Sequence, residues 1–259
     1  MRISYGKLHV PVHRIEGDDV FACEVSVEVL GENFARAYTE GDNSAVVATD
    51  TMKNFILRES LAYAGATLAG LCRSLGEQLL ATYPVMQALR VSARELRFDR
   101  LGERVFTRSE DDHGVAAVAI GRQGVTEVRG GRHGMRLLKT TGSAFTKFAR
   151  DEYTTLPERG DRPLFIRLDA DWRLADATAD VDPLAVRDHL AATFDGFVSE
   201  SIQHLVHEMG ARALARWEQL AEVSFTAENL TRDPVGEHGG RRLFTDPFPA
   251  QGLITLTLP

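Results

Sequence analysis

Several residues of this chain are of types that can remove a proton or hold a flat ring. Lys7 and Thr49 lie in its first fifth, and Phe145, Arg162 and Gln203 lie in its second half. A lysine whose pKa is lowered by desolvation or by nearby cations can act as a base. An arginine fork donates two parallel hydrogen bonds, a glutamine amide both donates and accepts, and a phenylalanine ring stacks on a planar ligand.

Taken singly, such residues have ordinary explanations. A lone lysine at a strand end is usually solvated, and a lone phenylalanine usually belongs to the core. His204 and His207 lie three residues apart in a helical pattern, which matches neither His-Glu-x-x-His nor its inverted form. No glycine-rich phosphate loop follows a predicted strand. We therefore expect no metal, nicotinamide, flavin or ATP site.

The composition is typical of a soluble globular protein, with 44% apolar and 26% charged residues in 259. A formal charge of -7 gives no reason to expect a nucleic-acid partner. No apolar run approaches the roughly 20 residues that cross a bilayer, and neither a signal h-region nor a C-terminal Ser-Lys-Leu is present. Cys23 and Cys72 fall in apolar patterns and are expected in the core. These features predict a cytoplasmic protein.

Periodicity predicts the elements of the first half. Alternating apolar residues over 21–29, a turn at 40–44 and an apolar run over 45–49 predict an antiparallel hairpin. Leucines and alanines at spacings of three and four over 61–79 predict a helix that ends at Tyr83-Pro84. Strands are expected over 91–98 and 114–120.

The second half has a similar order of elements. It contains a predicted strand over 164–168, an amphipathic helix over 202–217 and strands over 223–225 and 254–258. We therefore predict an internal duplication, with domains 1–130 and 131–259 and a seam at 130–134. The predicted fold class is α+β, an antiparallel sheet with helices on one face. The free edges of such a sheet need partners, which favours oligomerisation.

The order and spacing of several motifs resemble the urate oxidase (uricase) family, which has the tunnelling fold. The segments that carry the resemblance are Tyr5-Gly6-Lys7, 38–44, 47–54, 143–145, 148–156, Asp161-Arg162 and Ser201-Ile202-Gln203. The resemblance runs from about Tyr5 to the C-terminus. It implies two tandem ββααββ repeats, a sheet that closes into a barrel on oligomerisation, and a homotetramer with active sites between subunits.

The resemblance assigns the site residues of the first half to one subunit. Lys7 and Thr49 would form the pair that abstracts a proton, and the Thr49 hydroxyl would also help to hold a water or dioxygen. The backbone N–H of Asp50 would contact the heterocycle.

The neighbouring subunit would then bind the ring. Phe145 would stack on the ring face, and Arg162 and Gln203 would clamp the ring edge. Ile202, where the family usually has valine, would meet the ring through its backbone.

The last family motif is altered in this chain. Asn229 falls on the asparagine that helps to bind dioxygen or water over the ring, whereas Thr231 falls on the position of the family's relay histidine. An imidazole titrates near neutral pH and can shuttle a proton, which a threonine hydroxyl does only between stronger acids and bases. His238, seven residues beyond Thr231, is interpreted as loop surface.

The function implied is cofactor-independent oxidation of urate by dioxygen to 5-hydroxyisourate and hydrogen peroxide. Two alternatives remain open. Because Thr231 replaces the histidine, the substrate could be a different purine-like or pterin-like heterocycle. The chain could also be a non-catalytic homologue that binds a heterocycle.

Overall fold

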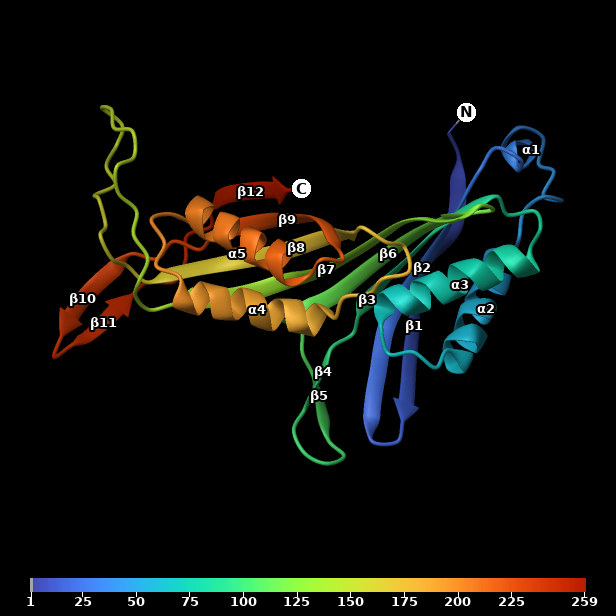
Figure 1. The fold of residues 1–259 in the computed structure, drawn as a ribbon, viewed down its shortest axis with the longest axis horizontal. Helices are drawn as coiled ribbons and strands as arrows, with labels where there is room; N and C mark the ends of the chain where they lie inside the picture. The colour runs from blue at the N-terminus through green and yellow to red at the C-terminus, as the bar shows by residue number, and fades with distance from the viewer. Residues whose placement is uncertain (1) are drawn as a thin grey trace.

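One antiparallel sheet of eight strands runs through the computed structural model, which describes residues 2–259 (Figure 1). The strands lie in the order β1-β2-β3-β6-β7-β8-β9-β12. Their bounds are β1 Ser4–Glu16, β2 Asp19–Leu30, β3 Ala88–Glu95, β6 His113–Gly121, β7 Gly124–Lys139, β8 Leu164–Leu174, β9 Leu220–Asn229 and β12 Gly252–Leu258. β1 and β12 form the two edges, and neither has a second strand partner within the described chain.

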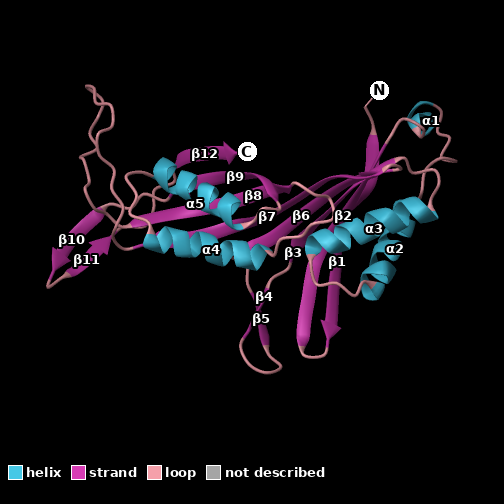
Figure 2. Ribbon diagram, in the orientation of Figure 1, coloured by secondary structure: helices cyan, strands magenta, loops and turns pink. Residues whose placement is uncertain are grey.

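Four helices cover one face of this sheet (Figure 2). They are α2 Thr49–Ala62, α3 Leu68–Thr82, α4 Pro183–Gly196 and α5 Ile202–Arg216. A short helix, α1 Ala35–Thr39, follows β2. Two small hairpins project from the body: β4 Phe98–Arg100 with β5 Phe106–Arg108, and β10 Pro234–His238 with β11 Arg241–Phe244. Without α1 and the hairpins, the order strand, strand, helix, helix, strand, strand occurs twice.

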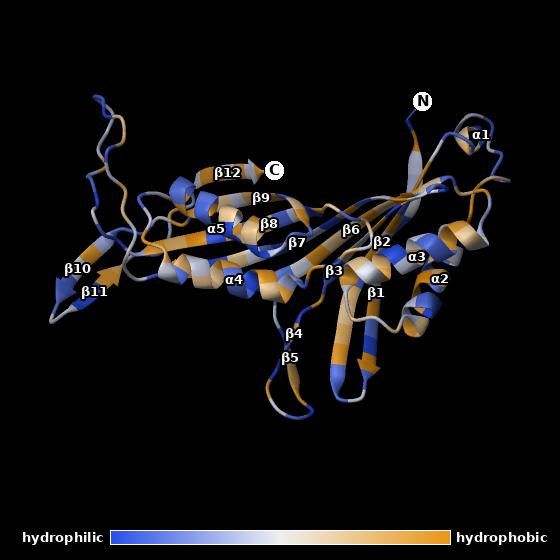
Figure 3. Ribbon diagram, in the orientation of Figure 1, coloured by the Kyte–Doolittle hydropathy of each residue, from blue (hydrophilic) through white to orange (hydrophobic). Residues whose placement is uncertain are grey.

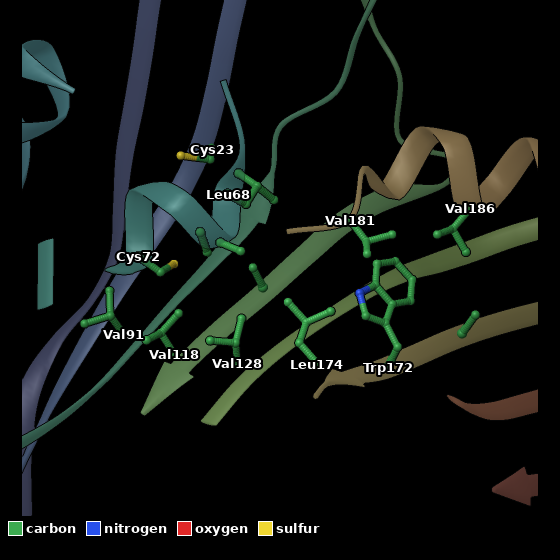
Figure 4. Close-up of a cluster of buried hydrophobic side chains, with 14 of the residues drawn as sticks. Cys23, Leu68, Cys72, Val91, Val118, Val128, Trp172, Leu174, Val181 and Val186 are labelled. Atoms are coloured by element: carbon green, nitrogen blue, oxygen red, sulfur yellow. The ribbon is translucent and has the colours of Figure 1, made fainter. Parts of the chain in front are cut away.

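Alternation along the strands builds the core between sheet and helices. Val25, Val27 and Val29 of β2 are at most 1% exposed, and they alternate with more polar residues on the opposite face. Hydrophobic and hydrophilic colours are mixed along the strands and helices in the same way (Figure 3). The buried residues form one continuous cluster that runs from Cys23 and Cys72 to Trp172 (Figure 4). Both halves of the chain therefore share one apolar layer.

A buried cluster of charges also joins the two halves. Arg132 of β7 is fully buried, and its guanidinium donates to Asp112 at 2.6 Å and to Glu95 at 2.7 Å. Arg97 forms a further ion pair with Asp112. A buried guanidinium needs such partners, because an unpaired charge in the interior is costly.

None of the helices within residues 2–259 combines the length and the apolar character that crossing a membrane requires.

The predicted α+β class, the expected strand over 114–120 and the expected helix over 202–217 are confirmed by the structure. The predicted strand over 45–49 is wrong, because residues 45–48 form a turn and a loop and Thr49 begins α2. β2 pairs with β1 and β3 instead, and the apolar loop residues pack against the core. Periodicity could not distinguish a short buried strand from a short buried loop.

The predicted helix over 61–79 also begins in the wrong place. Residues 61–62 end α2, and α3 begins at Leu68 after a break. Arg14 of β1 donates to the backbone carbonyls of Tyr63 and Gly65, which stabilises this break from outside the helix. The expected end at Tyr83 is confirmed, since Tyr83 is the C-cap of α3. The predicted seam at 130–134 lies inside β7, where the pairing with β8 shifts register between Arg132 and Met135.

Candidate active site

Lys7 lies on the helix-covered face of β1 because of a β-bulge. Lys7 pairs with Val27 and Val10 pairs with Val25, so three steps along β1 match two along β2. Residues opposite each other in an antiparallel pair share a face, and both valines are buried beneath the helices. His9, within the bulge, has a φ of 55°, and its N–H donates to Ser26. The bulge thus lets Lys7 and Val10 share a face despite their odd spacing.

Thr49 and Asp50 form the exposed first turn of α2. The N-cap residue, Ala48, has no side-chain hydrogen bond to the helix. The first N–H groups of a helix lack intrahelical partners, so this end of α2 can receive an acceptor or an anion.

The Asp50 carboxylate is neutralised by its own helix. Lys53 Nζ donates to Asp50 Oδ1 at 2.5 Å, and Asn54 Nδ2 donates to Oδ2 at 3.0 Å. Lys53 is the main cause that lowers the pKa of Asp50, and the charge of Lys7 adds to the effect. Lys7 therefore lies close enough to the start of α2 to act electrostatically on it.

Phe145 and Arg162 meet in the long loop 140–163, the olive loop at the left of Figure 1. Phe145 and Arg159 exchange both backbone hydrogen bonds, at 2.7 and 3.0 Å. The Arg162 N–H donates to the Ser143 carbonyl at 2.8 Å. Arg162 Cζ then lies 5.6 Å from the centroid of the Phe145 ring.

The Arg162 guanidinium has no counter-charge in the described part of the chain. Its Nε is buried without a hydrogen-bond partner, and no carboxylate of residues 2–259 lies within ion-pair distance. Burial lowers the pKa of Arg162, and the nearby charge of Arg159 lowers it further. A half-buried cation beside an aromatic ring can be stabilised by a planar anion.

The start of α5 lies against the same loop. The Ala144 N–H donates to the Ser199 carbonyl at 2.8 Å, and Ser201 caps α5 by accepting from the His204 N–H. Gln203 is exposed on the first turn, whereas Ile202 is buried.

Asn229 and Thr231 lie at the same end of the sheet. Asn229 is the last residue of β9 and lies opposite Ile166 of β8. Ile166 is fully buried under the helices, so Asn229 shares the helix-covered face. Thr231 follows where the chain leaves the strand and is half-buried.

The structure therefore gathers the predicted residues into two groups. Lys7, Thr49 and Asp50 lie at the β1 edge, whereas the other six lie around β8, β9 and the loop 140–163, at the opposite end of the molecule (Figure 1). These six are Phe145, Arg162, Ile202, Gln203, Asn229 and Thr231. Within residues 2–259, none of the cavities of about 340–350 Å³ is lined by a residue from either predicted group.

Three residues that shape the site had no role assigned from sequence. Tyr5 accepts the Val47 N–H at 3.0 Å and so holds the segment that leads into α2. Asp161 binds residues 141–143, and Phe148 stacks on Phe145 at 4.9 Å between centroids. All three lie within the sequence motifs that carry the family resemblance, and that position was the only indication of a role in the site.

The histidines were expected to form no metal site. His204 packs edge-on against Phe197, with ring centroids 4.8 Å apart. Across the described part of the chain, no three His, Cys, Asp or Glu side chains gather as a metal-binding group.

Comparisons with known proteins agree on one family. The family model described as uricase matches residues 128–243. A uricase of Haloferax volcanii is 40% identical over 88% of this chain and 88% of its own. A uricase of Halalkalicoccus jeotgali is 37% identical over 86% of this chain and 80% of its own. The crystal structure of a uricase from Bacillus fastidious, 34% identical, superposes with a TM-score of 0.91 over 99% of this chain and 93% of that one.

Proposed function

Because the chain belongs to the uricase family, we propose that it oxidises urate with dioxygen. The observation that carries the proposal is the Arg162–Phe145 pair. A guanidinium without a counter-charge beside an aromatic face is suited to a flat anion, and urate is one.

We propose that two subunits complete each site. The edges β1 and β12 have no second strand partner among residues 2–259, so copies that pair edge to edge would close the sheet into a barrel. That pairing would carry the Lys7 group of one subunit to the Arg162 group of its neighbour. A homotetramer is the assembly that the family resemblance implies.

In the first group, Lys7 is the base and Thr49 relays the proton that Lys7 removes. The free N–H of Asp50 at the start of α2 binds the ring, where the helix dipole favours negative charge. The carboxylate of Asp50 does not oppose this binding, because Lys53 neutralises it.

In the second group, Phe145 stacks on the ring, and Arg162 and Gln203 hold its edge. The backbone of Ile202 contacts the ring beside Gln203. Orientation and stabilisation of the anion are the main contributions of these residues to the rate. Asn229 holds dioxygen or water over the ring, and Thr231 takes the place of the relay histidine with a weaker hydroxyl.

The overall reaction balances without a metal or flavin. Urate, dioxygen and water give 5-hydroxyisourate and hydrogen peroxide. Two electrons pass from the urate anion to dioxygen, and the oxygen of water bonds to the oxidised ring. The protein removes the proton that makes the ring electron-rich and keeps the reactants in contact.

The test follows urate absorbance and peroxide together in the purified protein. We expect one peroxide for each urate lost, and loss of both signals in Lys7→Met and Thr49→Ala. Arg58→Gln, on the exposed part of α2, is the control and should keep full activity. Tight binding of a xanthine-like purine without urate turnover would instead indicate a different heterocyclic substrate. Absence of both binding and turnover would indicate a non-catalytic homologue.

A further inference from the structure

The ring of Phe145 stacks on a second aromatic ring of the same loop. Phe148 lies parallel to Phe145, with centroids 4.9 Å apart and planes 11° from parallel. Arg150 Cζ lies 5.4 Å from the centroid of the Phe148 ring. Each of the two stacked rings therefore also contacts an arginine of the loop 140–163, Phe148 contacting Arg150 and Phe145 contacting Arg162.

An unusual backbone conformation produces this stack. Lys147, which lies between Phe145 and Phe148 in the sequence, has a φ of 60°. This value is in the left-handed region that residues other than glycine rarely adopt. Its N–H donates to the Glu158 carboxylate at 2.8 Å. This turn brings residues 145 and 148 face to face, and the Glu158 bond holds the turn in place.

The packing of Phe145 therefore depends on a neighbour in its own loop. Phe145 is only half-buried, so the apolar core does not fix its ring plane. Its backbone is tied to Arg159, but backbone bonds leave the side-chain torsions free. The parallel contact with Phe148 constrains the tilt of the ring, together with the cation–π contact with Arg162.

We propose that Phe148 is a positioning residue that presents the Phe145 ring to the substrate. This inference rests on the proposed function, because it takes Phe145 as the surface on which the heterocycle stacks. Phe148 does not touch the substrate. It lowers the cost of ordering the ring before binding, and this pre-organisation strengthens binding. An aromatic pair of this geometry contributes a modest free energy beyond the area it buries.

The experiment compares Phe148→Leu, which keeps apolar volume but removes the ring, with Phe148→Tyr, which restores the ring. We expect Phe148→Leu to raise KM about three- to tenfold with little change in kcat. The dissociation constant of a non-oxidised xanthine-like purine should rise by the same factor. Phe148→Tyr should return both values to those of the wild type. Tyr153→Leu, at a residue 82% exposed in the same loop, is the control and should change neither value.

The outcomes separate this proposal from the proposed function. If the wild-type protein binds the purine but does not oxidise urate, the proposed function is wrong. The dissociation constants of the Phe148 variants for the purine would still test the positioning role of Phe148. An unchanged KM and dissociation constant in Phe148→Leu would overturn the positioning role. A fall in kcat with unchanged KM would also overturn it, because that pattern reports loss of folded protein. Lys147→Gly should leave KM unchanged, because glycine adopts the same φ freely.

Discussion

Lys7 and Arg162 lie at opposite ends of the sheet and cannot reach each other within one chain. Lys7 belongs to β1, Arg162 lies in the loop two residues before β8, and β2, β3, β6 and β7 lie between these strands. The two residues nevertheless have the properties of one site, namely a lysine near a helix start and a guanidinium that has no counter-charge among residues 2–259. Both features are explained if one subunit supplies Lys7 and a neighbouring subunit supplies Arg162 to the same site.

Mixed assemblies test this arrangement directly. Lys7→Met and Arg162→Gln should each be inactive alone. When the two variants are unfolded and refolded together in equal amounts, about one site in four should combine an intact Lys7 with an intact Arg162. We expect roughly that share of wild-type activity in the mixture. A mixture that assembles but stays inactive would show that both residues act within one subunit.

Asp161→Asn should weaken binding of the substrate ring. The Asp161 carboxylate accepts from the Thr141 hydroxyl at 2.5 Å and from the Gly142 N–H at 2.7 Å, and these contacts lower its pKa. The amide loses part of this charge-assisted bonding, so the segment before Phe145 becomes looser. We expect KM for urate to rise roughly tenfold with a smaller change in kcat. Asp151→Asn, in an exposed turn of the same loop, should leave KM unchanged.

Thr231→Val should separate the effect of the hydroxyl on the rate from the effect of the side-chain shape. The two side chains have nearly the same volume, so a loss of rate would report the hydroxyl itself. If Thr231 relays a proton, kcat should fall by about 10²-fold, the lower end of general acid–base effects. Thr231→Ser should keep most of the rate. Equal kcat values for the threonine and valine proteins would exclude the relay.

Arg132→Met should lower the free energy of unfolding by about 3–5 kcal/mol, because it leaves the buried carboxylate of Asp112 without its main partner. Chemical denaturation at fixed protein concentration measures this value. Arg129→Met is the matched control. Arg129 pairs with Glu127 at 2.8 Å on the surface, and its loss should cost less than about 1 kcal/mol. Equal losses for both variants would contradict a structural role for the buried cluster.

The pair His133–Asp171 should make stability depend on pH. The Asp171 carboxylate lies 2.8 Å from the His133 ring and raises the pKa of His133 above 6.5. The folded state therefore holds the proton more tightly than the unfolded state. This contribution is fully present below pH 6.5 and is lost as the pH rises through the raised pKa. Asp171→Asn should accordingly lower Tm more at pH 5.5 than at pH 9, and His133→Gln should remove that difference.

Periodicity predicted the fold class and most of the elements, because alternation and helical spacing mark which faces are buried. The strand over 114–120 and the helix over 202–217 are clear examples. Periodicity failed at 45–49, where a short apolar run packs as a loop that leads into α2, and at 63–67, where Arg14 from a distant strand stabilises a break between helices. Contacts between residues distant in sequence decide such cases.

The candidate site was predicted by motif order rather than by geometry. No pattern in the sequence reveals the bulge at His9 that sets the face of Lys7, or the left-handed turn at Lys147 that stacks Phe148 on Phe145. Both depend on backbone conformations that residues other than glycine seldom adopt. The split into two distant groups also follows from strand order, which periodicity leaves open.

The unpaired edges β1 and β12 have a consequence for the cell that makes this chain. If neighbours complete each site, a newly synthesised chain produces no peroxide until it has met another copy. Urate loss should then rise more steeply than gene dosage when the chain is scarce. Folding and oxidant production would thus be separated in time by the encounter between copies.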